Sequence, residues 1–194
     1  MTSHHRRFPD ELAFTLNNPI RRLLEPPDRL VAKLNVGARD VVLDFGCGTG
    51  FFTIPLAKVS ARTIGADVSP EMLERTGSYA KRSGVRVELI ESDGTAFKLP
   101  DEAVDMVFLN HVFHEIERRT TVLSEFLRIV KTSGRLVVVE RTQGNFLCGK
   151  LGPPVIDEKE VIRELEHAGF SLAEAIAHGK DTAIVSRRTL NTRR

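Results

Sequence analysis

An apolar run that ends in an acid and leads into a glycine-rich loop is the chemically most informative stretch of this chain. Residues 41–52 read VVLDFGCGTGFF, in which Asp44 closes the apolar run and glycines follow at alternate positions. Glycine takes positive φ angles at little cost and lets the backbone approach a ligand closely. A loop of this kind therefore predicts a nucleotide site, although by itself it is compatible with several nucleotides.

The glycine spacing narrows the choice of nucleotide. The glycines are Gly46, Gly48 and Gly50. A dinucleotide fingerprint, G-x-G-x-x-G, would place its third glycine at position 51, which is Phe51. A P-loop would continue with Lys and then Ser or Thr, and this loop does not. Asp44 ahead of the loop disfavours a pyrophosphate and favours a ligand that carries positive charge.

Two more acids close the next two apolar runs. Asp67 is placed to accept the hydroxyls of a ribose, and Asp93, followed by Gly94, is placed to meet a base edge. Each acid taken singly could equally be a helix N-cap or a surface charge. Acids after three consecutive strands, all at one edge of a parallel sheet, point instead to a common site.

Two histidines offer proton chemistry beyond the 104–110 run. His111 and His114 lie with Glu115 at helical spacing in the segment NHVFHEIE. Histidine titrates near neutrality, so both are candidate catalytic residues. The alternative is that one histidine packs under the ligand while the other caps the chain or pairs with Glu115. No metal site is expected, because H-V-F-H-E matches neither H-E-x-x-H nor its inverted form.

Apolar runs that alternate with helical patterns must position these residues. We expect strands at 41–45, 62–67, 86–92, 104–110 and 135–140, and helices at 26–34, 55–60, 69–84, 117–134 and 157–169. Ser69 and Asp157 are the expected N-caps, and Gly134 the expected end of the long helix. The alternation favours a parallel sheet covered on both faces. Two further runs joined at 178–181 predict a hairpin, so the sheet would end with an antiparallel strand.

The chain is expected to form one domain over residues 26–190, preceded by an arm. Residues 1–25 include Phe8 and Phe14, so this arm either packs on the body or acts as a lid over a pocket. The segment 141–156 is the longest stretch without a clear period. The loop and the arm together could close a small, apolar pocket.

The composition describes an ordinary globular protein. Hydrophobic residues make up 41% and charged residues 28% of 194 residues, and the formal net charge is +2. This balance does not require a nucleic-acid partner, and the arginines near both ends are interpreted as solvated charge. The two cysteines imply no disulfide framework. With no signal-peptide pattern and no apolar run near the roughly 20 residues of a membrane helix, we expect a cytoplasmic location.

At this point the chain resembles the class I S-adenosylmethionine (SAM)-dependent methyltransferases. VVLDFGCGTG is similar to their first motif, GADVSPEMLE to their second, ESDGTAFKLPDEAVDMVFLNHVFHEI to the stretch from their third through their fourth strand, and GRLVVVE to their fifth strand. The likeness covers roughly residues 30–190 and is greatest to the ubiquinone/menaquinone C-methyltransferase-like group. It implies a Rossmann-like α/β fold with a mostly parallel seven-stranded sheet, an antiparallel last strand, helices on both faces, and SAM as cofactor.

The resemblance also implies a role for individual residues. The loop residues Asp44, Phe45, Gly46, Cys47, Gly48 and Gly50 would lie beside the methionine part of SAM. Asp67 would bind the ribose hydroxyls and Val68 would lie against the adenine. The adenine amine would be accepted by Asp93 near the Gly94 amide, and the ammonium group by Asn110 beside His111.

The acceptor is less constrained than the cofactor. Because the methyl group of SAM is already activated, alignment is the first task of the protein, and a base is needed only if the attacking atom loses a proton. The segment 110–113 lacks the prolines of enzymes that methylate base amines, and no cysteine nucleophile stands near this strand end. A small-molecule acceptor is therefore favoured. The alternatives are an RNA or protein methyltransferase, or a non-catalytic SAM-binding regulator; the oligomeric state stays open.

Overall fold

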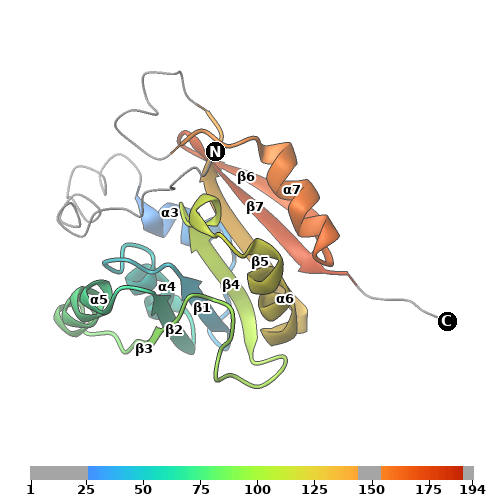
Figure 1. The fold of residues 1–194 in the computed structure, drawn as a ribbon. Coiled ribbons are helices and arrows are strands. Elements are labelled where there is room, and N and C mark those ends of the chain that lie inside the picture. Colours follow the sequence, from blue (N-terminus) through green and yellow to red (C-terminus); the bar gives the residue numbers. More distant parts are fainter. Residues whose placement is uncertain (1–25, 144–153, 190–194) are drawn as a thin grey trace, which may run out of the picture.

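A computed structural model describes residues 26–143 and 154–189 as a seven-stranded sheet with helices packed on it (Figure 1). The strands are β1 (Val41–Phe45), β2 (Arg62–Asp67), β3 (Glu88–Glu91), β4 (Val104–Asn110), β5 (Val130–Arg141), β6 (Phe170–His178) and β7 (Asp181–Arg188). The helices are α3 (Pro27–Lys33), α4 (Thr53–Val59), α5 (Pro70–Arg82), α6 (Arg119–Ile129) and α7 (Glu158–His167), with a 3-10 turn, η2 (Phe113–Glu115). The predicted arm 1–25, its suggested role as a lid, and residues 144–153 of the predicted loop lie outside the described residues.

The strand order β3-β2-β1-β4-β5-β7-β6 confirms the predicted sheet. All neighbours from β3 to β5 pair in parallel, whereas β7 pairs antiparallel with both β5 and β6. The chain order reverses beside β1, where β2 lies on one side and β4 on the other. In such sheets the ligand crevice lies at the carboxyl ends of the strands next to that reversal.

Local sequence signals explain where two of the helices begin. The Ser69 side chain accepts a hydrogen bond from the Met72 amide at 3.3 Å, and Pro70 occupies the first turn of α5. Asp157 caps α7 by accepting the Lys159 amide at 3.0 Å. Both predicted N-caps are therefore confirmed, and each satisfies a backbone donor that has no partner within the helix.

The predicted end of the long helix at Gly134 is wrong. The helix α6 ends at Ile129, and residues 130–134 belong to β5 instead. Val130 is fully buried and pairs with Val104, so burial against β4 outweighs the helical pattern. A side chain at Gly134 would lie 2.9 Å from the Asp105 carbonyl oxygen, so glycine is needed there for the close approach of two strands.

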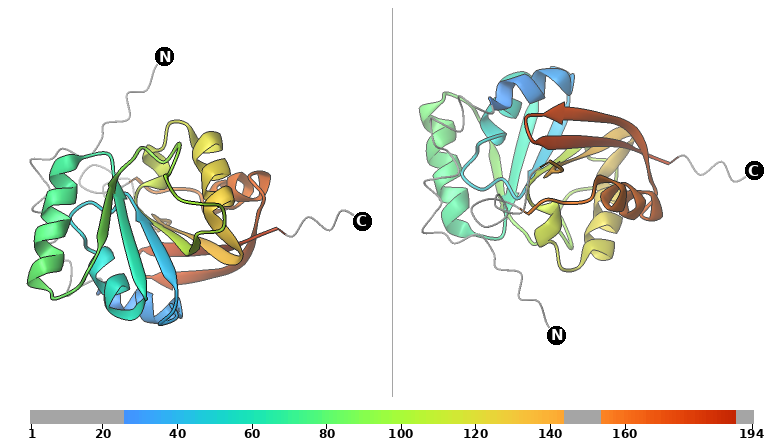
Figure 2. Two further views of the ribbon diagram at one scale, coloured as in Figure 1. Left: turned by 90° about the horizontal axis from the view of Figure 1, so that it is seen from below. Right: turned by 90° about the horizontal axis from the view of Figure 1, so that it is seen from above.

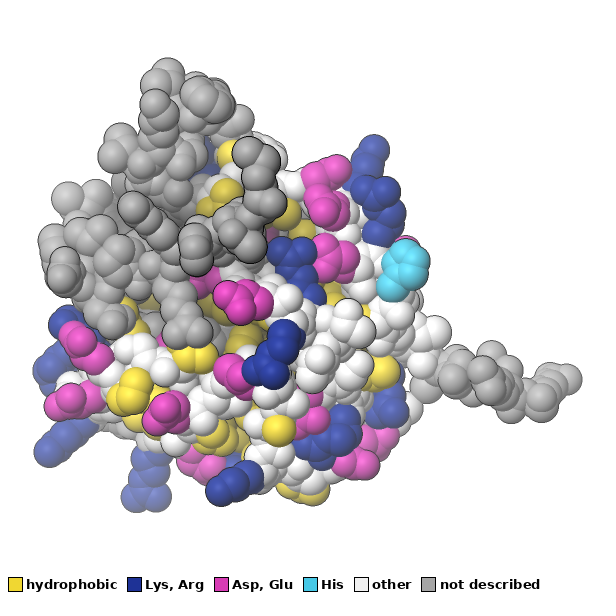
Figure 3. Space-filling model, viewed as in Figure 1, with side chains coloured by type: hydrophobic (Ala, Val, Ile, Leu, Met, Phe, Trp, Pro, Cys, Tyr) yellow, Lys and Arg dark blue, Asp and Glu magenta, His cyan; other side chains and the backbone are white. Residues whose placement is uncertain are grey.

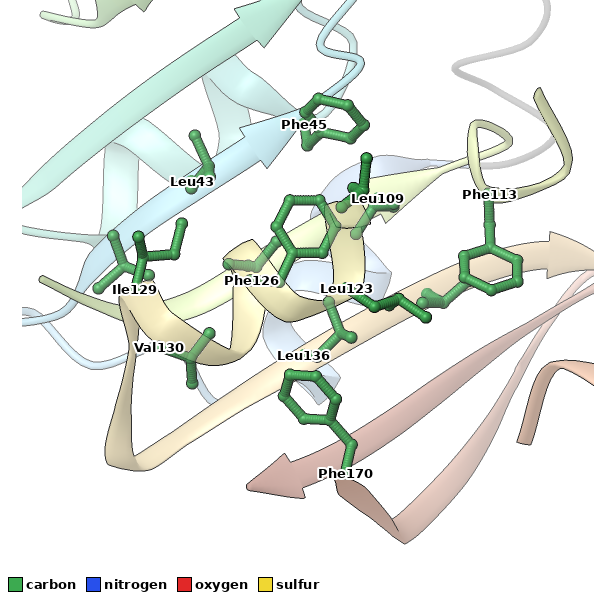
Figure 4. Close-up of a cluster of buried hydrophobic side chains, with 14 of the residues drawn as sticks. Leu43, Phe45, Leu109, Phe113, Leu123, Phe126, Ile129, Val130, Leu136 and Phe170 are labelled. Atoms are coloured by element: carbon green, nitrogen blue, oxygen red, sulfur yellow. The ribbon is translucent and has the colours of Figure 1, made fainter. Parts of the chain in front are cut away.

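The helices bury the sheet from both sides (Figure 2). On one face, α3 and α4 pack over Val42, Met106, Phe108 and Val137, and α5 lies beside α4 over β2 and β3. On the other face, α6 and α7 cover a second core (Figure 4). Phe126 of α6 lies near its centre, with its ring centroid 5.3 Å from that of Phe45. Helices on both faces are thus confirmed.

We expect replacement of Phe126 with alanine to destabilise the fold by about 3 to 5 kcal/mol, because the side chain is fully buried and leaves a cavity beneath α6. Urea denaturation followed by circular dichroism measures the change. The matched control is Ser124→Ala on the exposed side of the same helix, which should stay within about 0.5 kcal/mol of the parent. Equal midpoints for the two variants would contradict the packing of α6 described above.

Candidate functional site at the carboxyl edge of the sheet

The glycine loop after β1 is held by backbone and side-chain hydrogen bonds from neighbouring elements. Gly46, Gly48 and Gly50 have φ angles of 71°, 52° and 84°. The Gly46 amide donates to the Ala66 carbonyl of β2 at 2.8 Å, and the Thr76 hydroxyl of α5 donates to the Gly48 carbonyl at 2.7 Å. Because these contacts anchor the loop from β2 and α5, its backbone is presented to a ligand in a defined conformation.

Asp67 joins the end of β2 to the glycine loop. Its Oδ2 atom accepts the Gly48 amide at 2.9 Å, and its Oδ1 atom accepts the Ser69 amide at 3.0 Å. The residue is 9% exposed, whereas the neighbouring Val68 is 40% exposed. Each carboxylate oxygen has two lone pairs, so one on each oxygen remains for a ligand hydroxyl.

Asp44 lies deeper, at the base of the loop. It is almost fully buried, and the Thr53 hydroxyl of α4 donates to its Oδ2 atom at 2.6 Å. Burial raises the pKa of Asp44 from its ordinary value of 3.8 to about 7; the Thr53 hydrogen bond opposes this, and the nearby Asp67 carboxylate adds to it. The carboxyl group is therefore poised to change charge near neutrality, and a nearby cation would favour its ionised form.

Phe45 and Cys47 turn their side chains into the protein. Phe45 packs in the core under α6, and Cys47 is buried against Gly65 of β2. Burial, followed by the charges of Asp44 and Asp67, raises the pKa of the Cys47 thiol, so it is no nucleophile. These two predicted site residues can therefore reach a ligand through their backbone alone.

Asp93 stands apart from the buried acids, at the exposed rim beyond β3. Its carboxylate accepts the Thr95 hydroxyl and amide at 2.7 and 3.0 Å, and it pairs with the Arg118 guanidinium. The Thr95 hydrogen bonds and then Arg118 hold the pKa of Asp93 below its ordinary value. Gly94, with a φ of 81°, lies on the Phe45 ring, where a side chain would come within 2.7 Å.

The segment after β4 brings the two histidines to one buried carboxylate. Asn110 ends β4 half-buried, and His111 follows with a φ of 56°, its amide donating to the Val139 carbonyl at 2.9 Å. His114 Nδ1 lies 2.9 Å from Glu140 Oε2. His111 Nδ1 lies 3.7 Å from the same oxygen, and its Nε2 lies 3.0 Å from Asp181 Oδ2. The alternative that a histidine pairs with Glu115 fits less well, because that contact is 3.9 Å long.

No motif in the sequence points directly to Glu140 or Asp181 as residues of the site. Glu140 closes an apolar strand and is fully buried, and Asp181 follows the hairpin turn and is 4% exposed. The predicted hairpin could have located Asp181. Since β7 runs antiparallel to β5, the first residue of β7 lies at the carboxyl end of β5, where Asp181 pairs with Arg141. Burial acts to raise the pKa of both acids, but the adjacent imidazoles outweigh it and lower both.

The described ranges contain no group of three or more His, Cys, Asp or Glu side chains arranged to hold a metal ion. None of the helices in these ranges is both long and apolar enough to cross a membrane.

The raised pKa of Asp44 generates a prediction about stability and pH. The folded state favours the neutral acid, so the contribution of Asp44 to stability is full below pH 3.8 and is lost as pH rises through about 7. Asp44→Asn removes this titration. Its unfolding free energy, relative to the parent, should therefore rise by up to about 4 kcal/mol between about pH 4 and pH 8.

Urea denaturation of both proteins across that pH range measures the difference. Glu91→Gln, which replaces an exposed carboxylate on β3, is the control and should stay within about 0.5 kcal/mol of the parent at pH 7. A difference for Asp44→Asn that is constant with pH would show that Asp44 keeps an ordinary pKa in the folded protein.

Comparisons with known proteins assign the family. Residues 43–138 match a family described as a methyltransferase domain. A demethylmenaquinone methyltransferase of Lactobacillus johnsonii is 33% identical over 125 residues, covering 62% of this chain and 51% of that protein. A 27-O-demethylrifamycin SV methyltransferase of Amycolatopsis mediterranei is 29% identical over 187 residues, covering 93% of this chain and 65% of that protein. The chain thus spans about half to two thirds of the length of these curated relatives.

A solved structure has the same fold as this chain along nearly its whole length. The crystal structure of a SAM-dependent methyltransferase from Aquifex aeolicus superposes with a TM-score of 0.84 at 26% identity, covering 94% of this chain and 100% of that one. The family match begins within β1 and ends within β5, so it includes the glycine loop, Asp67 and the His111 segment. The chain belongs to the class I SAM-dependent methyltransferases, and its cofactor is SAM.

Proposed function

We propose that the chain transfers a methyl group from SAM to a small-molecule acceptor at the carboxyl edge of the sheet. The observation that carries the proposal is the Asp67 carboxylate, which accepts the Gly48 amide at 2.9 Å and joins the glycine loop to β2. The site fits SAM because the loop glycines have positive φ angles and present bare backbone. The free lone pairs of Asp67 suit the two hydroxyls of a ribose.

The other proposed cofactor contacts follow the order of the strands. Beside the methionine part we place Asp44, Gly46, Gly48, Gly50 and the backbone of Phe45 and Cys47; beside the adenosine part, Val68, Asp93 and Gly94; and beside the ammonium group, the carbonyl of Asn110, which His111 adjoins in the chain. Bound SAM supplies a methyl group on a positively charged sulfur. The residues of this chain hold and align the reactants, which accounts for much of the acceleration in such a transfer. His111 and His114 are the proposed catalytic residues.

Two observations support a small-molecule acceptor. The curated relatives include a demethylmenaquinone methyltransferase and a 27-O-demethylrifamycin SV methyltransferase, and both names specify small molecules. On the face seen in Figure 3, basic side chains are interspersed with acidic ones and do not gather in a single-sign patch. A polyanionic acceptor would favour such a patch.

Incubation with labelled SAM and fractionated cell extract tests the acceptor class. We expect label to enter the small-molecule fraction, where mass analysis identifies the product, and not the RNA or protein fractions. Label in RNA, lost at raised salt, would replace the proposal with an RNA methyltransferase. SAM binding with no labelled product in any fraction would favour a non-catalytic regulator.

Replacement of Asp67 with asparagine should weaken SAM and S-adenosylhomocysteine binding by about 10- to 100-fold, because charge-assisted hydrogen bonds to the ribose are lost. Titration calorimetry measures the affinities. Glu91→Gln, on the neighbouring strand, is the control and should bind as the parent does. Unchanged affinity in Asp67→Asn would remove Asp67 from the site, and binding of NADH with equal affinity would reverse the choice of ligand.

A further inference from the structure

We infer that His114 and Glu140 form a catalytic dyad that takes a proton from the acceptor, so the acceptor carries an ionisable hydroxyl of the phenol or enol class. This inference rests on the proposed methyl transfer and goes beyond it, because simple alignment of SAM with an acceptor requires no base. It also narrows the proposed pair of catalytic histidines: His114 touches the acceptor, whereas His111 becomes a positioning residue that acts through Glu140.

The geometry at His114 is that of a histidine oriented by a carboxylate. Its Nδ1 atom lies 2.9 and 3.1 Å from the two Glu140 oxygens, and its backbone amide also points at Oε1 at 3.3 Å. With the proton of neutral His114 on Nδ1, shared with Glu140, the lone pair of Nε2 is left available as a base. Its Nε2 atom lies 3.9 Å from Glu115 Oε1, which is beyond hydrogen-bond distance, and the side chain is 15% exposed. His114 is therefore fixed at one ring nitrogen, while the other is partly accessible.

Glu140 is kept ionised by what surrounds it. The carboxylate is completely buried, which alone would favour the neutral acid, but the two imidazoles outweigh burial and lower its pKa. His111 is itself placed between Glu140 and Asp181. Burial acts to lower the pKa of His111, but the two carboxylates raise it overall. His111 is thus biased toward the imidazolium form, which suits a supporting cation and not a proton acceptor.

The charged groups that face the dyad come from every strand packed against it. They are Glu115 on η2, His111 after β4, Arg141 on β5 and Asp181 on β7. Arg141 Nε lies 3.4 Å from Asp181 Oδ1, so it shares the neutralisation of Asp181 with His111. The network therefore holds two buried carboxylates with His111 between them and Arg141 beside Asp181, and His114 lies at its partly exposed edge.

The dyad is adjacent to the cofactor loop. Val112, between the two histidines, packs closely on Gly46. A β-carbon added to Gly46 would lie only 2.3 Å from a methyl carbon of Val112. Gly46 also has a φ of 71°, so the loop and the histidine segment are fitted to each other. The segment that carries His114 is therefore in direct contact with the cofactor loop at Gly46.

The proton balance of the proposed step defines the acceptor. The hydroxyl proton passes to His114 Nε2, and the resulting oxyanion supplies the electron pair for the new bond to the methyl carbon, either at oxygen or at a conjugated carbon. The carbon–sulfur bond breaks, and its electron pair leaves with sulfur. A proton lost from the attacked carbon or from His114 goes to solvent. An acceptor that is already anionic, or a neutral amine, would gain little from this base.

Imidazole nitrogen NMR on the protein without SAM tests the dyad independently of turnover. We expect the neutral form of His114 to carry its proton on Nδ1, shared with Glu140, and to carry none on Nε2. Glu140→Gln should change the nitrogen chemical shifts of His114, whereas His167→Gln, which removes an exposed histidine on α7, should leave them unchanged. A neutral His114 whose proton lies on Nε2 would overturn the inference.

The acceptor identified by the labelling experiment provides the second test. His114→Ala should lower kcat by about 100-fold or more with little change in SAM affinity, and added imidazole should restore part of the rate. The loss should shrink as pH approaches the acceptor's own ionisation. Glu140→Gln should lower kcat by about 10-fold or more, and His167→Gln should leave it unchanged.

The outcomes separate this inference from the proposed function. Methyl transfer that survives His114→Ala within about threefold overturns the dyad and leaves the methyltransferase proposal intact. Absence of methyl transfer in the parent protein overturns the proposed function, whereas the NMR result still decides the state of His114. Should Glu140→Gln fail to fold, His114→Ala and its rescue by imidazole decide the matter.

Discussion

Removal of carboxylates from water at one edge of the sheet is the constraint on which the site depends. Asp44, Asp67, Glu140 and Asp181 are each at most 9% exposed, and a buried charge without compensation is costly. Each acid is compensated in a different way. Asp44 favours its proton, Asp67 accepts two backbone amides, and Glu140 and Asp181 face imidazole and guanidinium groups. The same acids that would bind a ligand thereby also hold together the loops around it.

The direction of the strands explains why these acids lie at one edge of the sheet and why they form two groups there. The parallel strands β1 and β2 deliver Asp44 and Asp67 to the glycine loop, which forms the cofactor half of the site. The ends of β4 and β5 deliver the histidines and Glu140. Only an antiparallel neighbour could bring the first residue of a strand to this edge, as β7 does with Asp181. The reversed last strand thus contributes a side chain that a wholly parallel sheet would supply from its opposite edge.

Features that depend on neighbouring residues in the sequence could be predicted, whereas features that depend on contacts between distant strands could not. The bounds of β1, β2 and β4 agree with the sequence because each is a short, largely buried run, after which Gly46, the Ser69 cap or His111 follows within two residues. The Ser69 and Asp157 caps could also be predicted, because each side chain accepts the amide of a residue two or three positions further along the chain. The end of α6 could not, since Val130 joins the sheet through its pairing with Val104. Glu140 was missed for the same reason: nothing within its own strand indicates that two histidines will flank it.

The backbone conformation of His111 links the end of β4 to the segment that carries His114. A non-glycine residue at a φ of 56° costs about 1 to 3 kcal/mol, although histidine tolerates this region better than most. Two contacts hold it there, the amide hydrogen bond to Val139 and the ring contact with Asp181. The left-handed turn ends the parallel pairing of β4 with β5 beside Val139, and three residues later His114 contacts Glu140, the next residue of β5. The turn at His111 thus leads directly into the segment that places both imidazoles near a single buried carboxylate.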